Sequence, residues 1–181
     1  ETSKKRLRIL DVGCSKGFIG KSLCKMHDFY GIELSKEDAK TAGEYYKDIK
    51  IMDIDDKLDY QNAPFNLSSF DVIIMADIIE HLKDPLKTII YFKKFLKKNG
   101  LLIISVPNIA NIYSRTKLLL GFFDYGERGI LDKTHLKFFT LRSFRMLIKN
   151  SGLNAEKEDV TPIPLPTIIP IFSEEGMLNF V

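Results

Sequence analysis

Two kinds of hydrophobic pattern follow one another along the chain. Short apolar runs predict strands, and runs with apolar residues at helical spacing predict helices. The predicted strands are residues 7–12, 29–34, 49–54, 70–75 and 101–106. The predicted helices are residues 18–26, 36–47, 85–98 and 141–150. Strands that alternate with helices in this way indicate βαβ units and a parallel sheet covered by helices on both faces.

Capping and turn residues support these boundaries. Ser35 is a typical helix N-cap and is followed by two acids in the first turn. Pro85 stands at the first position of the next helix, and Asn99-Gly100 is expected to end it. Thr140 is the expected N-cap of the helix at 141–150. The Val-Ile-Ile run in the fourth strand is typical of a strand buried on both faces.

The alternation lapses after the fifth strand. Residues 109–134 begin as a helix and continue into a glycine-rich, aromatic stretch, which we interpret as an inserted lid or substrate loop. Residues 153–160 predict a sixth strand. Residues 161–170 hold four of the seven prolines, which excludes a central strand and favours an extended edge or linker. We therefore expect one domain at 1–160 and a Pro-rich extension at 161–181, with a seventh strand near 176–181.

Composition and charge narrow the class of protein. A chain of 181 residues with 45% hydrophobic content can bury one substantial core. A net charge of +3 is ordinary for a soluble protein and does not indicate an obligate nucleic-acid binder. The only cysteines, Cys14 and Cys24, argue against a disulfide framework and for a reducing compartment. No apolar run reaches the roughly 18 residues of a membrane span, so we expect a cytoplasmic protein.

The first predicted strand ends in the turn Asp11-Val-Gly-Cys-Ser-Lys-Gly17. A glycine-rich turn between a strand and a helix lets the backbone approach a ligand closely. The dinucleotide-binding pattern G-x-G-x-x-G is missing, and the Asp11 carboxylate would repel a pyrophosphate. That disfavours a dinucleotide oxidoreductase. A carboxylate at the turn instead suits a cofactor with a cationic part, such as one that carries an amine and a sulfonium.

Acidic residues also close the next two strands. Glu33 follows the glycine turn by about 20 residues, where a carboxylate can accept hydrogen bonds from ribose hydroxyls. The alternative for Glu33 is a solvated carboxylate at a strand end. Asp53 ends the third predicted strand and is a candidate acceptor for an adenine amino group. Asp55, Asp56 and Asp59 crowd the same loop, and any of them could serve instead.

Three segments carry a resemblance to a known family. They are Leu-Arg-Ile-Leu-Asp-Val-Gly-Cys-Ser-Lys-Gly, then Gly-Ile-Glu, then Ser-Phe-Asp-Val-Ile-Ile-Met-Ala-Asp-Ile-Ile-Glu-His-Leu-Lys-Asp-Pro. Together they resemble class I S-adenosylmethionine-dependent methyltransferases of the ubiquinone-biosynthesis and methionine-biosynthesis-W type, over about residues 7–152. The resemblance implies a Rossmann-like, doubly wound, mostly parallel seven-stranded sheet whose last strands are antiparallel. It implies S-adenosylmethionine as the cofactor, and methyl transfer to an O or N acceptor on a small molecule or a glycan-linked substrate.

The resemblance also implies roles for residues at the strand ends. The glycine turn would hold the methionyl part of the cofactor, the second-strand acid the ribose, and the third-strand acid the adenine, while residues after the fourth strand line the cofactor. The implied cofactor-binding residues are Asp11, Gly13, Cys14, Gly17, Glu33, Leu34, Asp53, Ile54, Ala76 and Asp77. Ser15 stands where many members have a second glycine, a departure that is tolerated if its φ is negative.

His81 and His135 are the candidate catalytic bases, because imidazole titrates near neutrality. If residues 77–81 are helical, Asp77, Glu80 and His81 share one face. With His135 from the loop they could bind a divalent cation. This set is similar to the metal site of small-RNA 3′-terminal 2′-O-methyltransferases, which use a Glu-x-x-Glu-His helix and a distant His. Asp77 replaces the first Glu, and Glu-His-Leu-x-Asp-Pro is common in members without a metal, so we expect no metal.

Alternative readings remain open for both histidines and for the whole chain. His81 could pack or hydrogen-bond near the cofactor, and His135 could tie down its loop. The alternative to an enzyme is a cofactor-binding regulatory module of a longer protein, which would have no need of the acid and histidine cluster. A metal-assisted RNA methyltransferase is a further alternative. Its support is a set of basic residues around the lid, although solvated cations are the ordinary explanation for them: Arg128, Lys133, Lys137, Arg142 and Arg145.

Overall fold

The computed structural model describes residues 5–56, 58–59 and 61–160. Its centre is a sheet of five parallel strands in the order β3-β2-β1-β4-β5. The strands are β1 (Arg8–Val12), β2 (Asp28–Glu33), β3 (Asp48–Ile51), β4 (Phe70–Ala76) and β5 (Leu96–Ser105). The chain builds outward from β1 to β3 and then returns to add β4 and β5 on the other side of β1. Ligands in open parallel sheets bind at such a reversal, outside the carboxyl ends of the strands.

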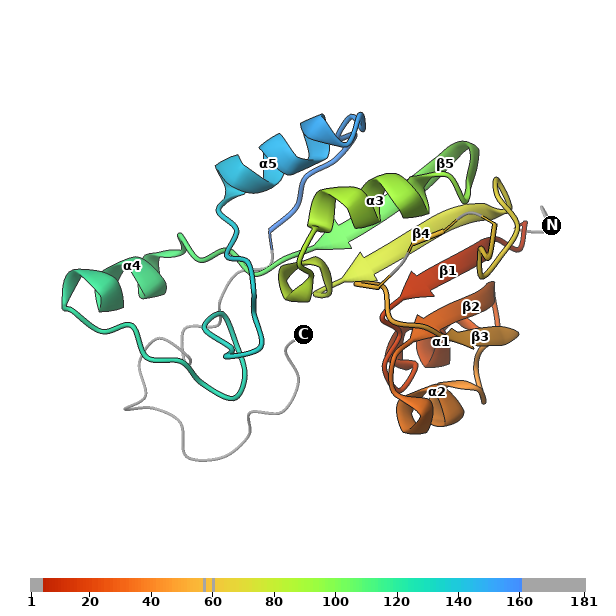
Figure 1. Ribbon diagram of the computed structural model, residues 1–181, viewed down its shortest axis with the longest axis horizontal. Helices are drawn as coiled ribbons and strands as arrows, with labels where there is room; N and C mark the ends of the chain where they lie inside the picture. The colour runs from red at the N-terminus through yellow and green to blue at the C-terminus, as the bar shows by residue number, and fades with distance from the viewer. Residues whose placement is uncertain (1–4, 57, 60, 161–181) are drawn as a thin grey trace.

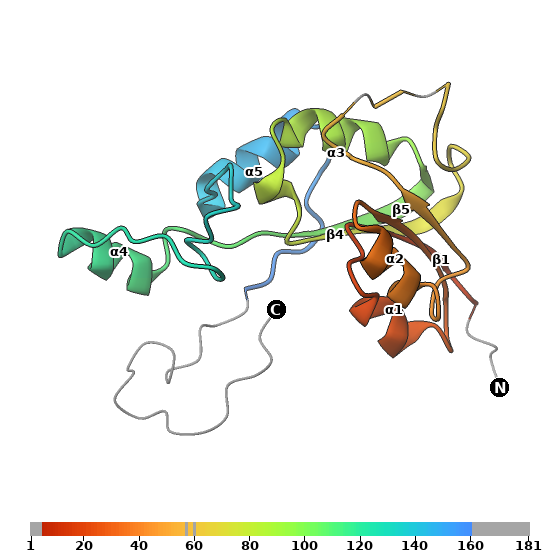
Figure 2. The same ribbon diagram turned by 60° about the horizontal axis from the view of Figure 1, so that its bottom comes forward.

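Helices cover both faces of this sheet (Figures 1 and 2). Helices α1 (Phe18–Leu23) and α2 (Lys36–Ala42) lie on one face beside β1 to β3. Helices α3 (Pro85–Lys93) and α5 (Leu141–Asn150) lie on the opposite face and pack against each other. Helix α4 (Ile112–Leu119) extends away from the sheet, past the carboxyl ends of the strands (Figure 1). The predicted doubly wound fold is confirmed.

The two faces of the central strands form two apolar clusters. Because side chains alternate along a strand, Leu10 and Ile73 point toward α3 and belong to the larger cluster, and both are fully buried. Their neighbours Ile9 and Ile74 point to the other face and pack in the cluster beneath α1 and α2. The Val-Ile-Ile run of β4 therefore contributes to both clusters, as its composition predicts.

The boundary between α3 and β5 differs from the prediction. The helix ends at Lys93 and the strand begins at Leu96, whereas the sequence indicated a helix to residue 98 and a strand from 101. The Phe95 side chain is fully buried, and its carbonyl accepts the N–H groups of Ser69 and Phe70. The chain has therefore joined the sheet before it reaches the predicted turn. Asn99 adopts a φ of 64° within the strand, next to a register shift opposite β4.

Other elements are shorter than predicted. Helix α1 ends at Leu23, helix α2 ends at Ala42 instead of residue 47, and β3 ends at Ile51 instead of residue 54. The early end of α2 has a clear cause. Gly43 caps the helix, and Tyr46, three residues later, turns into the core with 7% of its surface exposed. The helical periodicity of the sequence does not predict that Tyr46 is buried in this way.

The predicted sixth strand at residues 153–160 is wrong, because that segment forms no strand. Residues 154–160 are exposed, and Glu158 instead pairs with Arg145 on α5 at 2.9 and 3.0 Å. Four charged residues in succession leave no apolar face to bury. The predicted edge at 161–170 and strand at 176–181 lie outside the described residues, so a seven-stranded sheet with an antiparallel end stays a prediction. Among the described residues, no helix is long and apolar enough to cross a membrane.

Candidate functional site

The glycine turn follows β1 and lies at the carboxyl edge of the sheet. Gly13 and Gly17 have φ values of 76° and 80°, in the left-handed region that favours glycine. The N–H groups of Gly13 and Cys14 both donate to the carbonyl of Ile32, at 2.8 and 3.1 Å, which fixes the turn to β2. A Cβ on Gly13 would lie 2.8 Å from the Ile78 side chain. The turn therefore touches the segment that follows β4 and has no room for a side chain there.

Ser15 and Glu33 hold each other in place across the turn. The φ of Ser15 is 46°, in the left-handed region. A serine in place of glycine was expected to be tolerated here only at a negative φ, and this condition is not met. Its N–H donates to the Glu33 carboxylate at 2.8 Å. The other oxygen of Glu33 accepts the N–H groups of Leu34 and Ser35, each at 2.9 Å. Glu33 thus stands at the predicted place beside the turn and also organises the backbone around it.

Asp11 lies beneath the turn with 2% of its surface exposed. Its Oδ2 accepts a hydrogen bond from the Tyr46 hydroxyl at 2.5 Å. Burial raises the pKa of Asp11 to about 6, and the nearby charge of Glu33 adds to the rise, while the Tyr46 hydrogen bond opposes it. Burial likewise raises the pKa of Cys14 to about 12, so this thiol is protonated at neutral pH and does not have the character of a reactive cysteine.

The predicted adenine-binding acid lies beyond the strand instead of at its end. Asp53 is exposed, two residues after β3, and its Oδ1 accepts the N–H of Asp55 at 2.8 Å. Asp55 in turn accepts the N–H of Lys83 at 3.0 Å, which ties this loop to the segment before α3. Ile54 between them is buried. Among the acidic residues of this loop, Asp55 therefore stabilises the loop, whereas the Asp53 side chain is exposed to solvent at the sheet edge.

The segment after β4 does not form the predicted face. A short 3₁₀ helix, η1 (Ile79–His81), begins after Asp77, whose φ of 47° is left-handed. The Asp77 carboxylate accepts a hydrogen bond from the Ser105 hydroxyl of β5 at 3.0 Å. The prediction that Asp77 shares a helical face with Glu80 and His81 is wrong, because the helix covers only residues 79–81 and Asp77 lies outside it with a left-handed φ. Asp77 and Ala76 remain at the carboxyl end of β4, as the resemblance implies.

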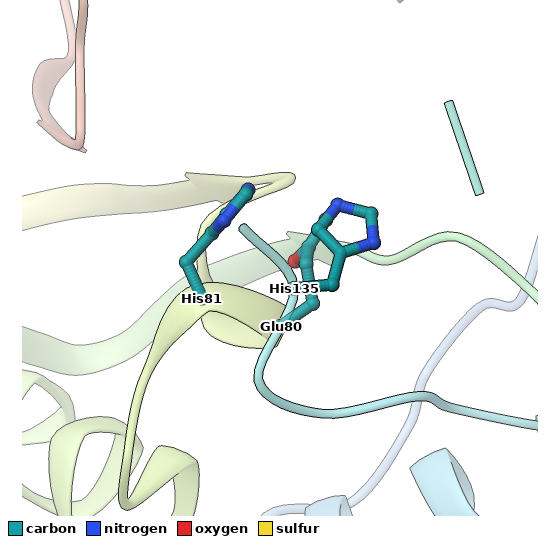
Figure 3. Close-up of side chains that lie close together, drawn as sticks. All are labelled: Glu80, His81 and His135. Carbon is teal, nitrogen blue, oxygen red and sulfur yellow. The ribbon is translucent and has the colours of Figure 1, made fainter. Parts of the chain in front are cut away.

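Glu80, His81 and His135 come together on one side of η1 (Figure 3). One potential ligand atom from each lies within 4.8 Å of the others, and the two imidazole rings meet edge to face with centroids 4.7 Å apart. His81 Nδ1 lies 3.2 Å from the carbonyl of Thr134, and His135 Nδ1 lies 3.1 Å from that of Ile130. A carbonyl only accepts hydrogen bonds, so these contacts favour the proton on Nδ1. Each Nε2 then keeps its lone pair for a proton or a metal.

Glu80 is the most constrained member of this cluster. It has 1% of its surface exposed, and neither carboxyl oxygen has a hydrogen-bond partner among the residues that the structure describes. Burial raises the pKa of Glu80 to about 7, and the charge of Asp77 contributes to the rise. Its backbone carbonyl accepts the N–H groups of Leu136 and Lys137, each at 2.9 Å, which attaches the segment directly after the lid to η1.

This cluster has the donor set of a divalent-metal site. Two imidazole nitrogens and one carboxylate suit transition metals, and imidazoles that donate Nδ1–H to backbone carbonyls are typical of metal-ligating histidines. Asp77 does not belong to the cluster, so the four-residue set considered from the sequence is reduced to three in the described residues. The same three groups can also act without a metal, as a proton-accepting unit beside an acceptor.

Aromatic side chains of the lid lie next to the histidines. Phe123, Tyr125 and Phe138 form a group with ring centroids 5.5 to 6.3 Å apart, and the His135 ring lies 6.2 Å from Phe138. Phe123 and Tyr125 are partly exposed. Two residues of the aromatic stretch predicted as a lid, Phe123 and Tyr125, therefore lie beside the cluster through Phe138. Phe138 and Tyr46 were missed, because aromatic residues at such spacings are more often simple core residues.

Residues 1–158 match a family model described as a methyltransferase domain. The chain belongs to this family. Among curated relatives, the methyltransferase domain is 32% identical over 109 residues to a ubiquinone biosynthesis O-methyltransferase of Pelagibacter ubique, a match that covers 58% of the chain and 43% of that protein. It is 27% identical over 155 residues to a protein of the same name from Cereibacter sphaeroides, covering 82% and 60%. The chain spans about half the length of the curated relatives it matches.

Solved structures support the same fold. The methyltransferase domain matches, with a TM-score of 0.66 and 18% identity, a structure of the Trm112 methyltransferase activator of Haloferax volcanii in complex with a methyltransferase; the match covers 93% of this chain and 73% of that one. It matches a SAM-dependent methyltransferase of Archaeoglobus fulgidus with a TM-score of 0.62 and 18% identity, covering 93% and 77%.

Family membership implies S-adenosylmethionine as the cofactor, and the residues at the sheet edge fit it. The glycine turn, Glu33 and the exposed Asp53 all lie along that edge.

Proposed function

We propose that this methyltransferase domain transfers a methyl group from S-adenosylmethionine to a hydroxyl or amine of a small-molecule or glycan-linked acceptor. The observation that carries the proposal is the position of the Glu80, His81 and His135 cluster. It follows β4 directly, and Ile78, which precedes η1, contacts Gly13 in the cofactor turn. A proton-accepting cluster thus lies next to the place where the family holds its methyl donor. The O-methyltransferase names of the curated relatives favour a hydroxyl acceptor.

The cofactor-binding roles proposed for the chain follow from chemistry at the sheet edge. The Glu33 carboxylate accepts hydrogen bonds from three N–H groups. Because a carboxylate has about four lone-pair positions, Glu33 can still accept a hydrogen bond from a ribose hydroxyl. Asp53 is exposed and can accept from an adenine amino group. Asp11 supplies negative charge beneath the turn, where it favours the ammonium group of the methionyl part. Gly13, Gly17 and Ala76 provide close approach without side-chain bulk.

When bound, S-adenosylmethionine supplies an electrophilic methyl carbon on a sulfonium. The protein must align the acceptor with that carbon and exclude water. In this proposal Phe123, Tyr125 and Phe138 flank the acceptor, because their rings lie beside His135. The unprotonated Nε2 of His81 or His135 then accepts the hydroxyl proton as the oxygen attacks. Glu80 stabilises the resulting imidazolium when it is ionised.

The same cluster supports a second candidate, in which a divalent cation polarises the acceptor hydroxyl. The gathering of Glu80, His81 and His135 favours it, and the removal of Asp77 from the set reduces the number of ligands to three. An acceptor assay with Mg²⁺, with Mn²⁺ and with EDTA separates the two modes. Loss of turnover with EDTA and recovery with Mn²⁺ would support the metal.

A cytoplasmic location also stays a proposal, and it rests on the free thiols Cys14 and Cys24.

The first experiment is calorimetric titration with S-adenosylhomocysteine, with NAD as the negative control. Because Glu33 also organises the backbone, Glu33→Gln is a better variant than Glu33→Ala, and Glu37→Gln on the exposed side of α2 is the matched control. We expect binding that weakens only in Glu33→Gln. A folded wild-type protein that does not bind S-adenosylhomocysteine would exclude the proposed function. Turnover that survives both His81→Ala and His135→Ala would exclude the cluster as its base.

A further inference from the structure

Tyr46 links the two sides of the cofactor turn. Its hydroxyl donates to Asp11 Oδ2 at 2.5 Å and accepts the N–H of Gly20 at 3.3 Å. Asp11 is the residue before the last of β1, and Gly20 lies in the first turn of α1, where N–H groups have no partner within the helix. One buried hydroxyl therefore joins the strand that enters the turn to the helix that leaves it.

Three glycines make room for the Tyr46 ring. A Cβ on Gly20 would lie 2.2 Å from Tyr46 Cε2, and a Cβ on Gly17 would lie 3.0 Å from the same atom. A Cβ on Gly31 of β2 would lie 3.1 Å from Tyr46 Cδ1. The ring also packs edge to face on Phe29, with centroids 5.5 Å apart. Contacts from three elements hold the ring in one position, so the hydroxyl has a fixed direction.

The groups that face Asp11 do not otherwise stabilise its negative charge. Glu33 on β2 opposes the charge, and so would an ionised Cys14, whose burial keeps it a neutral thiol. Asp38 on α2 adds negative charge near Cys14. Among the described residues, the hydrogen bond from Tyr46 is the side-chain contact that favours the Asp11 anion and lowers its pKa. A hydrogen bond to a charged group contributes about 1.5 to 3 kcal/mol.

We propose that Tyr46 is a positioning residue for the cofactor site: its hydroxyl orients the Asp11 carboxylate and keeps it anionic toward a cationic methionyl group. The inference rests on the proposed function for its ligand. It makes a specific statement about pH, because a ligand that carries an ammonium group binds more tightly when Asp11 is ionised. Affinity should therefore rise as the pH rises through the pKa of Asp11, and Tyr46 should set where that rise occurs.

The test compares Tyr46→Phe with Tyr45→Phe, a neighbouring tyrosine that does not contact Asp11. S-adenosylhomocysteine affinity is measured by calorimetry from pH 5 to 8, and the Asp11 pKa is measured without ligand by carboxyl ¹³C NMR. Loss of a hydrogen bond of this strength predicts a midpoint about one pH unit higher. Binding should therefore be roughly tenfold weaker near pH 5, below both midpoints, and only about twofold weaker near pH 7. Tyr45→Phe should match the wild type in both measurements.

The outcomes separate this inference from the proposed function. If wild type does not bind the ligand, the proposed function fails, and the NMR shift of the Asp11 pKa alone decides whether Tyr46 controls that carboxyl. If wild type binds and Tyr46→Phe has the same midpoint, the inference is overturned. Should Tyr46→Phe be less stable, the double variant with Asp11→Asn separates a loss of binding that acts through Asp11 from one caused by lower stability. The inference requires that Tyr46→Phe weakens binding much less in the Asp11→Asn background, and an equal loss in both backgrounds overturns it.

Discussion

Replacement of Gly20 by alanine tests the packing beneath the cofactor turn most directly. Gly20 lies in α1, and its φ is not in the left-handed region, so alanine is favourable for the local backbone. Helix propensity alone predicts a stabilisation of about 1 kcal/mol. The structure predicts the opposite sign, because the added Cβ would lie 2.2 Å from Tyr46 Cε2 and 2.7 Å from Cζ.

The magnitude follows from how little the ring can move. Carbon atoms in contact are about 3.5 to 4 Å apart, so the Cβ and the ring must separate by more than about 1 Å. Gly17 and Gly31 lie close to other atoms of the same ring and block that movement. Overpacking of this kind costs about 1 to 3 kcal/mol, and a blocked ring belongs at the upper end. After the helix gain is subtracted, Gly20→Ala should lower the free energy of unfolding by about 2 kcal/mol, or Tm by roughly 4 to 8 °C.

Urea denaturation and thermal unfolding measure this change, with Gly43→Ala as the control. Gly43 caps α2 in helical geometry, and its Cβ would meet no atom closer than 3.3 Å, so that variant should be neutral or slightly more stable. Tyr46→Leu should recover part of the stability lost in Gly20→Ala, because it removes the atoms in conflict. A Gly20→Ala protein as stable as the wild type would refute the argument that the Tyr46 ring is fixed.

Three further changes test other parts of the structure. Ser15→Gly should raise the free energy of unfolding by about 1 kcal/mol in urea denaturation, because it removes a side chain from a φ of 46°; no gain would contradict that strain. The pKa of Asp11, raised by burial to about 6, makes its contribution to stability complete below about pH 4 and lost as pH rises through about 6. Unfolding free energies measured from pH 4 to 7 should therefore fall by about 3 kcal/mol on account of this group, and should do so less in Asp11→Asn. Thr140→Ala removes the capping box of α5 and should cost about 1 kcal/mol, whereas Thr41→Ala on the exposed side of α2 should cost less.

Local signals in the sequence predicted the fold where they agreed with tertiary contacts. The helix at 141–150 was predicted with its observed bounds, because Thr140 and Ser143 form a cap within four residues of each other. The doubly wound parallel sheet was predicted from the βαβ pattern and the resemblance. The end of α3 was misjudged because its continuation, Phe95 to Lys98, has helical composition. The backbone pairing of Phe95 and Leu96 with residues 69 and 70 decides the outcome there, and these partners lie 25 or more positions away.

The residues of the candidate site likewise fall into those that local sequence signals predicted and those that depend on tertiary contacts. Glu33, Gly13 and Gly17 were predictable, because each lies at the end of a strand or in the turn between that strand and the next helix, whose positions the pattern fixes. The Asp77 to His81 segment was not, because its shape depends on Asp77 adopting a φ of 47° while it bonds to Ser105 on the neighbouring strand. His135 lies 54 residues after His81 in the chain. The two rings meet where Leu136 and Lys137 donate to the carbonyl of Glu80 and the Thr134 carbonyl contacts His81 Nδ1. The residues that complete the cluster are therefore placed by backbone contacts of the lid, and substitutions that weaken this attachment should separate the histidines without altering either of them.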